Sequence, residues 1–434
     1  MICYYFPPLS DVGGKRSVAF AKYFRKHGWH PHVLSVSNPD KAFCSVGGEA
    51  PPEGIPTRYC RSLANVSRAF GRLNGALSKV LGLFGVKLTR NVFHDALCYP
   101  DRFAGWVPMA AWTGARMARQ NRIDAIYVSC SPFSAALVGL FLKRRTGLPL
   151  VLDFRDPFVA GVGEQFVASK VRRRILAWFE RRFVEGADLL LLTSEETRDE
   201  YVKAYPGIDG KTFTVYNGFD AVVSLDRKLP KFEKFTIIYT GEFYNFGEHH
   251  QRYTALYFEA LAHLRETAVI DRENFQFLFY GHQAGLIEQK AEAYGVADLV
   301  VARGRIPYAQ VLEHISRSHL MLLRIVKLMI STKLFEGIPL DVPFLATIPR
   351  GEAENLVRRY SPGSYVITEE GSFLDVADAI TDAMARYGRG EMPPNRIDEF
   401  LAGFTREQLA LKVMQLVDIT VSAHQGRARA QRLQ

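Results

Sequence analysis

Long uncharged apolar runs are absent from this 434-residue sequence. A membrane-spanning helix requires about 18 such residues in a row, so we expect no transmembrane helix. The opening residues, MICYYFPPLS, lack the basic start and the long apolar core of a signal peptide, and they lead directly into strand-like residues. We therefore expect a cytoplasmic protein.

Cysteine is also scarce, and no two cysteines stand in a CxxC pair. That spacing argues against a zinc site of the common kinds and favours reduced thiols in a cytoplasm. A disulfide framework is not expected in a chain of this size. The five cysteines are Cys3, Cys44, Cys60, Cys98 and Cys130.

Acidic residues are under-represented in the first half of the chain. Residues 1–220 contain 30 Lys and Arg against 19 Asp and Glu, whereas residues 221–434 contain 25 against 26. The net charge of +10 therefore comes from the N-terminal half, which predicts an anionic partner such as a membrane surface, a phosphorylated lipid or nucleic acid. No aromatic-basic recognition motif is present, so we do not expect nucleic-acid binding.

Residues 54–94 carry the basic excess without any acid. Leu, Val and Phe are interleaved with the basic residues, a composition typical of an amphipathic helix lying on anionic lipid. We predict a basic amphipathic insertion that contacts the inner face of the cytoplasmic membrane; the alternative is a solvated helical insertion. The basic residues are Arg58, Arg61, Arg68, Arg72, Lys79, Lys87 and Arg90.

Short apolar runs alternate with amphipathic stretches along both halves of the chain. Runs that are apolar throughout are typical of parallel strands covered on both faces, and the alternation indicates βαβ units. With 48% apolar residues and this length, we predict an α/β protein of two doubly wound domains. The predicted domains are 1–216 and 217–395, followed by a C-terminal helix in 396–434 that packs back toward the N-terminal domain.

Ligands bind beyond the carboxyl ends of the strands in such sheets, and four segments follow predicted strands. In SDVGGKR, Gly13 and Gly14 let the backbone approach a ligand ahead of a helix; a plain structural turn is the alternative. In LDFRDPF, Asp153, Arg155 and Asp156 can hydrogen-bond a sugar, or an Asp–Arg pair can fix the loop.

The third segment, YTGEFYNFGEHHQR, leaves a strand at Gly241 and continues into a polar loop with Glu242 and Arg252. His249 and His250 form an adjacent pair there. No third ligand stands at a recognisable spacing, so we predict no metal site.

The fourth segment is STKLFEGIPLDVP. Lys333 and Glu336 lie three residues apart and share one helix face, after the potential N-cap Ser331. A cation suits phosphate and a carboxylate suits a vicinal diol, which a nucleotide combines; the alternative is a surface ion pair of little energetic consequence. Pro339 removes an amide donor, so we predict a short or kinked helix.

Taken in order, these pieces resemble the GT-B-fold nucleotide-sugar glycosyltransferases, in particular bacterial family-4-like members. The matching segments are YYFPPLSDVGGKR, SCSPFSAALVGLFLKRRTGLPLVLDFRDPF (129–158), VYNGFD (215–220), IIYTGEF, ARGRIPYAQVL (302–312) and TKLFEGIPLDVPFLAT (332–347), with PDRFAGWVPMA (100–110) as a further similarity.

The resemblance implies two Rossmann-like domains facing a cleft, with the nucleoside-diphosphate sugar on the C-terminal domain and the acceptor on the N-terminal domain. It implies transfer with retention of configuration, and no metal or other cofactor. Helix N-termini and basic side chains would stabilise the leaving diphosphate.

The resemblance also assigns roles by position. Glu336 matches the carboxylate that binds the ribose hydroxyls, and Lys333 matches a lysine facing the diphosphate. Gly241 would bring backbone amides near the phosphates, in a donor-binding loop with Glu242 and with Arg252 as a second cation. Gly13 and Gly14 match the loop under the donor sugar, and Asp156 would contact sugar or acceptor. The expected catalytic residues are Asp156, Lys333 and Glu336.

One position departs from the family pattern. Many family-4 enzymes have a Glu eight residues before the second Glu, and here that position is Leu328. Glu352 and Glu354 in RGEAENLV could supply a carboxylate, or they could form a solvated helix start.

The sequence therefore predicts a retaining, metal-independent glycosyltransferase that modifies a lipid-linked or polysaccharide acceptor in cell-surface glycan biosynthesis. Two alternatives stay open: a nucleotide-sugar 2-epimerase of the same fold, and a catalytically weak scaffold or binding subunit.

Overall fold

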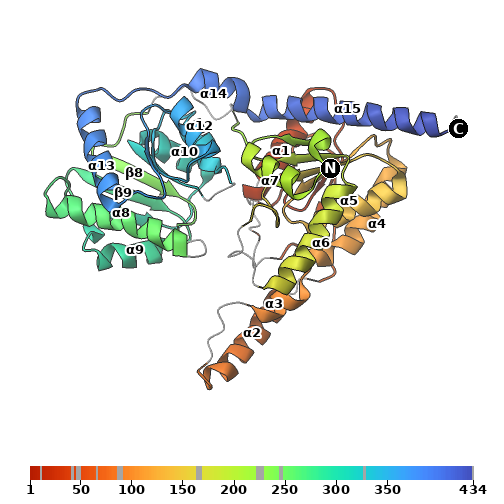
Figure 1. Ribbon diagram of the computed structural model, residues 1–434, viewed down its shortest axis with the longest axis horizontal. Coiled ribbons are helices and arrows are strands. Elements are labelled where there is room, and N and C mark those ends of the chain that lie inside the picture. The colour runs from red at the N-terminus through yellow and green to blue at the C-terminus, as the bar shows by residue number, and fades with distance from the viewer. Residues whose placement is uncertain are drawn as a thin grey trace. The chain divides into compact units, whose positions relative to one another are not determined.

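The computed structural model describes residues 1–9, 12–40, 44, 50–64, 67–85, 91–162, 169–220, 229–243, 248–325 and 329–432. The chain forms two compact units (Figure 1). Unit 1 contains Met1–Asn217 and Arg406–Gln434, and unit 2 contains Gly218–Thr405. The chain first passes from unit 1 to unit 2 after Asn217, one residue beyond the predicted domain end at residue 216.

Unit 1 is built on a parallel sheet in the order β3-β2-β1-β4-β5-β6-β7. The order reverses between β1 and β4, which makes the sheet doubly wound. Its central strands are buried throughout, as their continuous apolar runs predict. The strands are β1 (Ile2–Cys3), β2 (Val33–Val36), β3 (Thr57–Cys60), β4 (Ile126–Cys130), β5 (Leu150–Phe154), β6 (Leu189–Leu192) and β7 (Thr212–Thr214).

Helices connect β1 to β2, and they connect each strand from β3 to β6 to the next one along the chain. Several begin or end at residues suited to the purpose: Ser169 and Ser194 cap the helices that follow them, and Gly147 ends α5 in the left-handed conformation. The helices of unit 1 are α1 (Val12–Lys26), α2 (Ser67–Gly82), α3 (Val92–Leu97), α4 (Val107–Gln120), α5 (Ser134–Thr146), α6 (Lys170–Gly186), α7 (Glu195–Ala204) and α15 (Arg406–Arg432).

Unit 2 repeats the architecture with the order β10-β9-β8-β11-β12-β13, again all parallel. Two doubly wound α/β units confirm the predicted fold class. The strands are β8 (Phe235–Thr240), β9 (Phe275–Tyr280), β10 (Val300–Arg303), β11 (Leu320–Arg324), β12 (Phe344–Thr347) and β13 (Tyr365–Ile367). The helices are α8 (Glu248–Glu266), α9 (Ala284–Ala293), α10 (Tyr308–Arg317), α11 (Thr332–Gly337), α12 (Glu352–Tyr360), α13 (Phe373–Gly388) and α14 (Ile397–Phe404).

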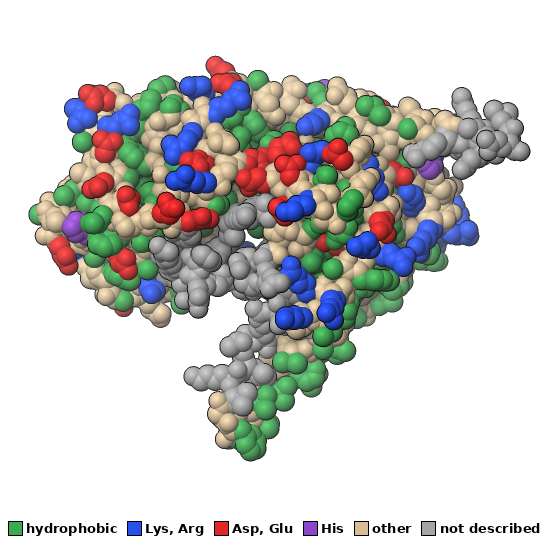
Figure 2. All heavy atoms as spheres, viewed as in Figure 1, with side chains coloured by type: hydrophobic (Ala, Val, Ile, Leu, Met, Phe, Trp, Pro, Cys, Tyr) green, Lys and Arg blue, Asp and Glu red, His purple; other side chains and the backbone are tan. Residues whose placement is uncertain are grey.

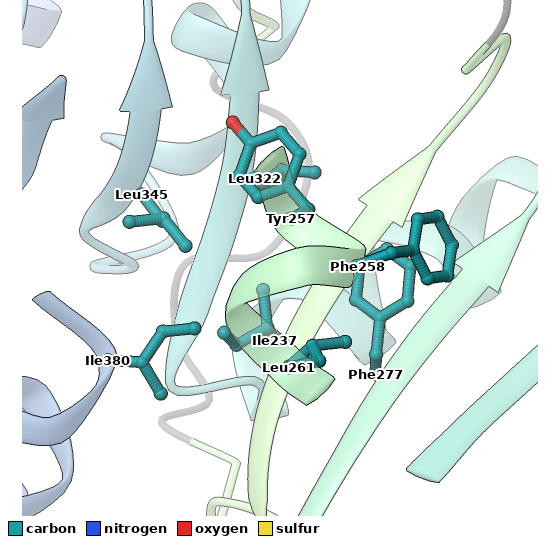
Figure 3. Close-up of a pocket in the computed structure, with 8 residues that line it drawn as sticks. All are labelled: Ile237, Tyr257, Phe258, Leu261, Phe277, Leu322, Leu345 and Ile380. Carbon is teal, nitrogen blue, oxygen red and sulfur yellow. The ribbon is translucent and has the colours of Figure 1, made fainter. Parts of the chain in front are cut away.

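The core of unit 2 lies between the sheet and the helices α8 and α13. Figure 3 shows the side chains that line a small apolar gap there. Tyr257 contributes the polar atom at its edge, and its hydroxyl is hydrogen-bonded to Thr347 Oγ1 at 2.6 Å. The apolar lining makes this gap part of the packed interior rather than a ligand site. The lining residues are Ile237, Tyr257, Phe258, Leu261, Phe277, Leu322, Leu345 and Ile380.

The C-terminal segment 396–434 is divided between the units: residues 406–434, with helix α15, belong to unit 1, the side expected for the C-terminal helix, whereas residues 396–405 belong to unit 2. In unit 2, Phe400 and Phe404 of α14 pack beside Phe335, with ring centroids 5.8 Å from it in each case. Helix α15 instead packs on α1 in unit 1, where Lys26 Nζ lies 2.7 Å from a Glu407 carboxylate oxygen. The division follows from where the apolar side chains are buried.

We had expected the whole segment 54–94 to be an insertion, but only part of it is. Residues Thr57–Cys60 form the edge strand β3, which pairs with β2 in parallel register. Beyond it, α2 and α3 pack against each other through the stacked rings of Phe70 and Phe93, whose centroids are 6.3 Å apart. The helical part of the prediction is thus confined to these two helices.

The structure bears on two expectations from the sequence, reduced cysteines and the absence of a transmembrane helix. All five cysteines are buried and free. Within the described ranges, no helix has both the length and the apolar character needed to cross a bilayer.

Candidate functional site

The donor-site candidates of unit 2 lie at its topological switch point. Strand order reverses between β8 and β11, and ligands of open α/β sheets bind where the loops leaving two such strands diverge, at the carboxyl edge of the sheet. Gly241 follows β8 directly, and Arg324 is the last residue of β11. The next helix along the chain, α11, carries Lys333 and Glu336.

Gly241 and Lys333 are brought together at this edge. Gly241 has φ of +106°, a backbone conformation that side chains with a Cβ rarely adopt. A Cβ at this position would lie 3.3 Å from Lys333 Nζ. The ammonium group also lies 4.9 Å from the centroid of the Tyr239 ring. The predicted glycine and cation therefore share one small space above the end of β8.

Helix α11 is short and is fixed at both ends. The Ser331 hydroxyl accepts a hydrogen bond from the Lys333 amide at 3.3 Å, as an N-cap does. The helix ends at Gly337, two residues before Pro339, so the prediction of a short helix is confirmed. Phe335 points the other way and is buried, which anchors the turn that presents Lys333.

Glu336 is half-buried on the same helix, and its carboxylate is hydrogen-bonded to a tyrosine. The hydroxyl of Tyr308, the first residue of α10, donates to its Oε1 at 2.9 Å. This bond orients the carboxylate without neutralising it, so the second oxygen can accept a hydroxyl of a ligand. Glu336 does not form an ion pair with Lys333 within the described residues, contrary to the simplest alternative reading of the sequence.

The remaining residues of this loop are less closely grouped. Glu242 is exposed, with its Oε1 3.7 Å from His282 Nε2, and its carbonyl accepts from the Tyr239 hydroxyl at 2.7 Å. Arg252, His249 and His250 lie on α8, and their side chains lie outside the described residues, as does Leu328. The described residues include no group of three potential metal ligands.

Glu352 and Glu354 occupy the first turn of α12. Glu354 pairs with Arg358 one turn later, with 2.8 Å between Oε1 and Nε. This is the geometry of a helix-surface ion pair, so the structure gives Glu354 a local role in place of a contact to a ligand.

Arg324 is a potential site residue that the sequence reasoning missed. Its guanidinium lies over the Phe243 ring at 4.7 Å and donates to the Phe243 carbonyl. It therefore holds the loop that leaves β8 against the end of β11. A charged residue closing the apolar run HLMLLR was the available signal.

In unit 1, Gly13 and Gly14 belong to the first turn of α1 rather than to a separate turn before it. A Cβ on Gly13 would lie 2.7 Å from Arg155 Nη1, and one on Gly14 would lie 3.3 Å from the Tyr5 carbonyl oxygen. The guanidinium of Arg155 donates to the carbonyls of Gly13 and Ser131. Arg155 thus ties the start of α1 to the loops after β4 and β5.

Asp153 and Asp156 have different environments although both follow from the motif LDFRDPF. Asp153 is fully buried and accepts two hydrogen bonds from the Arg16 guanidinium at 2.8 and 3.0 Å, and another from the Tyr127 hydroxyl. Burial, and then the Asp153 charge, raise the pKa of Tyr127 well above its ordinary value, so this hydroxyl stays a donor. The structural Asp–Arg pair is therefore Asp153 with Arg16.

Asp156, in contrast, is exposed, and no hydrogen bond or ion pair to another described residue is found for its side chain. It stands just beyond the end of β5, at the carboxyl edge of the unit 1 sheet. It is available there to contact a ligand, but it is not grouped with Gly13 and Gly14 by any described contact.

Taken together, the edge of unit 2 offers an ammonium group, an oriented carboxylate and a glycine that leaves room beside them. A diphosphate can accept from Lys333 while a diol donates to Glu336.

Residues 13–218 match the family model of the glycosyl transferase 4-like domain. No curated protein sequence matches the chain. Among solved structures, a sucrose-phosphate synthase from Thermosynechococcus elongatus is similar with a TM-score of 0.63 and 16% identity, covering 97% of this chain and 98% of that one.

HepE of Anabaena in complex with UDP and glucose is similar with a TM-score of 0.61 and 14% identity, covering 94% of this chain and 97% of that one. WaaG, a glycosyltransferase involved in lipopolysaccharide biosynthesis, has a TM-score of 0.60 and 16% identity, over 95% and 97% of the two chains. These likenesses show the fold over the full length. The sequence match to the glycosyl transferase 4-like domain covers residues 13–218, and the solved glycosyltransferases share the two-unit fold of the whole chain.

Proposed function

We propose that the enzyme transfers a sugar from a nucleoside-diphosphate sugar bound at the switch point of unit 2. The observation that carries the proposal is the meeting of Gly241 and Lys333, where a Cβ would lie 3.3 Å from the ammonium nitrogen. This arrangement leaves a cation beside an unobstructed stretch of backbone, which suits a diphosphate. The solved HepE structures with UDP and with UDP-glucose support a donor of this class.

Each side chain then has a separate task. Lys333 binds the diphosphate and stabilises the charge that develops on it as the sugar leaves. Glu336, oriented by Tyr308, accepts hydrogen bonds from the ribose hydroxyls. Glu242 and Arg252 complete the loop around the phosphates, and Arg324 holds that loop in place. In unit 1, we assign Gly13, Gly14 and Asp156 to contacts with sugar or acceptor, as the family resemblance implies.

The proposed reaction is retaining and needs no metal ion. Lys333, with the backbone amides of the Gly241 loop and the start of α11, supplies positive potential for the leaving diphosphate. An assay with and without a chelator measures metal dependence, and the anomeric configuration of the product identifies the stereochemistry. A chelator-sensitive rate or an inverted product contradicts this part of the proposal.

We propose a lipid-linked or glycan acceptor, used at the inner face of the cytoplasmic membrane in cell-surface glycan synthesis. The support lies in the basic N-terminal half and in the exposed apolar tip that follows α2, where Leu83 and Phe84 are 84% and 77% exposed. Such a tip beside basic residues is suited to an anionic lipid surface.

The first experiment is a thermal-stabilisation screen of UDP, GDP, inorganic pyrophosphate and the corresponding nucleotide sugars. A ligand that binds only the folded state raises the melting temperature. We expect a nucleoside diphosphate to stabilise the wild type, and Lys333→Ala to lose the effects of nucleotide and pyrophosphate together. If no nucleoside diphosphate stabilises the protein at millimolar concentration, the donor assignment is wrong, and the scaffold alternative takes its place.

Product analysis in the absence of acceptor separates the transferase from the 2-epimerase alternative. The transferase releases free sugar slowly or not at all, whereas an epimerase converts the donor into its 2-epimer or the product of that reaction. Accumulation of an epimer without acceptor contradicts the transferase proposal.

A further inference from the structure

The helices α4, α5 and α6 form one continuous layer on unit 1 (Figure 1). Helices α4 and α5 are in close contact, since a Cβ on Gly114 would lie 2.8 Å from a Leu142 methyl group. Helices α5 and α6 are joined where Lys143 Nζ donates to the Gly186 carbonyl at 2.9 Å. The outward side chains of the three helices therefore belong to a single surface, here called the arginine–aromatic face.

Each helix of this face presents a large aromatic side chain to the outside. Trp112 of α4, Phe141 of α5 and Trp178 of α6 are 54%, 46% and 53% exposed. Residues of this size are usually buried in the core, and three of them on neighbouring helices mark a surface that is covered in use. On α4 the exposed side chains Trp112 and Arg116 are one helical turn apart, so they lie on the same side of the helix.

Arginine accompanies each aromatic residue. The Arg116 guanidinium lies 4.7 Å from the Trp112 ring centroid, and that of Arg182 lies 5.2 Å from the Trp178 ring centroid. Phe141 is followed one turn later by two exposed arginines. No acidic partner in the described part of the chain pairs with the arginines of this face, which are Arg116, Arg119, Arg144, Arg145, Arg174 and Arg182.

Acidic residues hardly contribute to the face. Helices α4 and α5 contain none. On α6, Glu180 points inward and accepts from the Val159 and Ala160 amides at 2.8 and 2.9 Å. Glu185 is exposed and lies 3.7 Å from Arg181. The electrostatic potential over the face is therefore strongly positive.

The face continues into the hairpin of α2 and α3. Arg172, at the start of α6, donates to the carbonyls of His94 and Cys98 at 3.4 and 3.2 Å, and so fastens α3 to α6. Figure 2 shows apolar side chains along this edge of unit 1, from the hairpin tip up toward α5, with basic side chains beside them. Exposed apolar residues on both sides of the junction include Leu73, Val80, Leu83, Phe84, Val92, Leu97 and Val171.

We propose that the arginine–aromatic face of α4, α5 and α6 docks flat on an anionic lipid bilayer, continuous with the α2–α3 hairpin. The inference deepens the proposed membrane-linked function and rests on it. Trp and Arg together suit this partner, because indole rings lie at the headgroup level while arginines bind lipid phosphates. Sequence composition indicated membrane contact for residues 54–94 alone. The arginine–aromatic face adds three helices that follow this segment in the chain.

The test uses the full-length protein and vesicles of neutral phosphatidylcholine with or without phosphatidylglycerol. We expect the wild type to co-sediment with the anionic vesicles and to release at high salt. The triple variant R116Q/R144Q/R182Q should bind about 100-fold more weakly, at roughly fivefold for each basic residue lost. The variant W112A/W178A should lose about tenfold through its smaller apolar contact.

A matched control removes the same charge from unit 2. R272Q/R350Q/R389Q replaces three exposed arginines there, and we expect it to bind the vesicles like the wild type. Tryptophan quenching by brominated lipid gives a second measurement: the wild type should be quenched, and W112F/W178F should not. UDP affinity is measured on every variant as well. A wild type that binds UDP but not vesicles contradicts the membrane inference alone, whereas a wild type that does not bind UDP contradicts the donor site.

Three results overturn the inference. The first is equal binding of the wild type and R116Q/R144Q/R182Q to anionic vesicles. The second is an equal loss in the unit 2 control, which would reflect net charge alone. The third is a wild type that ignores vesicles but self-associates or binds nucleic acid through these arginines, since the face would then have another partner.

Discussion

Replacement of Gly241 by alanine tests the geometry of the donor site most directly. The residue has φ of +106°, and an added Cβ would lie 3.3 Å from Lys333 Nζ. The substitution therefore has two effects, one on the backbone and one on the position of the ammonium group.

The backbone effect should cost about 1–3 kcal/mol of stability, the usual range for a non-glycine residue held in a sparsely populated conformation. The second effect is smaller for stability, because the crowded atom is the far end of a flexible side chain and can move by a few tenths of an ångström. That movement matters for the ligand. A hydrogen bond to a charged group is worth about 1.5–3 kcal/mol, so its partial loss should weaken UDP binding by roughly tenfold.

Two measurements are combined. Urea unfolding gives the stability of each variant, and a calorimetric titration under conditions in which each variant is folded gives its UDP affinity. Lys333→Ala should weaken UDP binding by about 10- to 100-fold. In the double variant the losses should fall short of additive, because Gly241→Ala acts on the nucleotide partly through Lys333. Gly285→Ala is the matched control: a Cβ there meets nothing within 4 Å. Unchanged UDP affinity in Gly241→Ala refutes the placement of the diphosphate.

Three further predictions concern single side chains. Glu336→Ala should weaken UDP binding about tenfold and leave pyrophosphate binding unchanged, since the carboxylate binds the ribose; equal losses for the two ligands would place it on the phosphates. Glu180→Ala should destabilise the fold by about 3–5 kcal/mol, because the Val159 and Ala160 amides and the Tyr201 and Tyr205 hydroxyls lose their acceptor; urea unfolding measures this, and a loss below 1 kcal/mol would contradict it. Burial, followed by the charge of Lys231, lowers the pKa of His319 to about 4. The unfolded chain therefore takes up this proton first, so stability should fall as pH decreases from about 6.5 to 4, by at most about 3 kcal/mol, and His319→Gln should flatten that slope.

The alternation of apolar runs and amphipathic stretches was sufficient to predict the two doubly wound units. Strands buried on both faces are apolar at every position, and LLLL in β6 can hardly be accommodated elsewhere. The edge strand β3 was missed because Thr57–Cys60 is half-exposed and short, so its sequence looks like that of a loop. The end of helix α11 was predicted as well, because the effect of Pro339 is local: proline removes an amide donor wherever it stands.

The site divides in the same way. Sequence spacing placed Lys333 and Glu336 on one helical turn, and the turn exists as predicted. Lys333 lies beside Gly241 because β8 and β11 are neighbouring strands. The two residues are about 90 positions apart, so their contact cannot be predicted without the strand order. The same holds for Tyr308, which orients Glu336 from α10.

By itself, then, the sequence determined the local features of this protein: strand and helix segments, the cap at Ser331, the short α11 and the surplus of basic residues in the first half. These depend on interactions between residues near one another in the chain. The tertiary structure decided which distant residues become neighbours. It paired Asp153 with Arg16 in place of Arg155, divided residues 396–434 between the units, and gathered the arginines and aromatic residues of α4, α5 and α6 on one face. Those outcomes follow from strand order and the burial of apolar faces, which are properties of the whole chain.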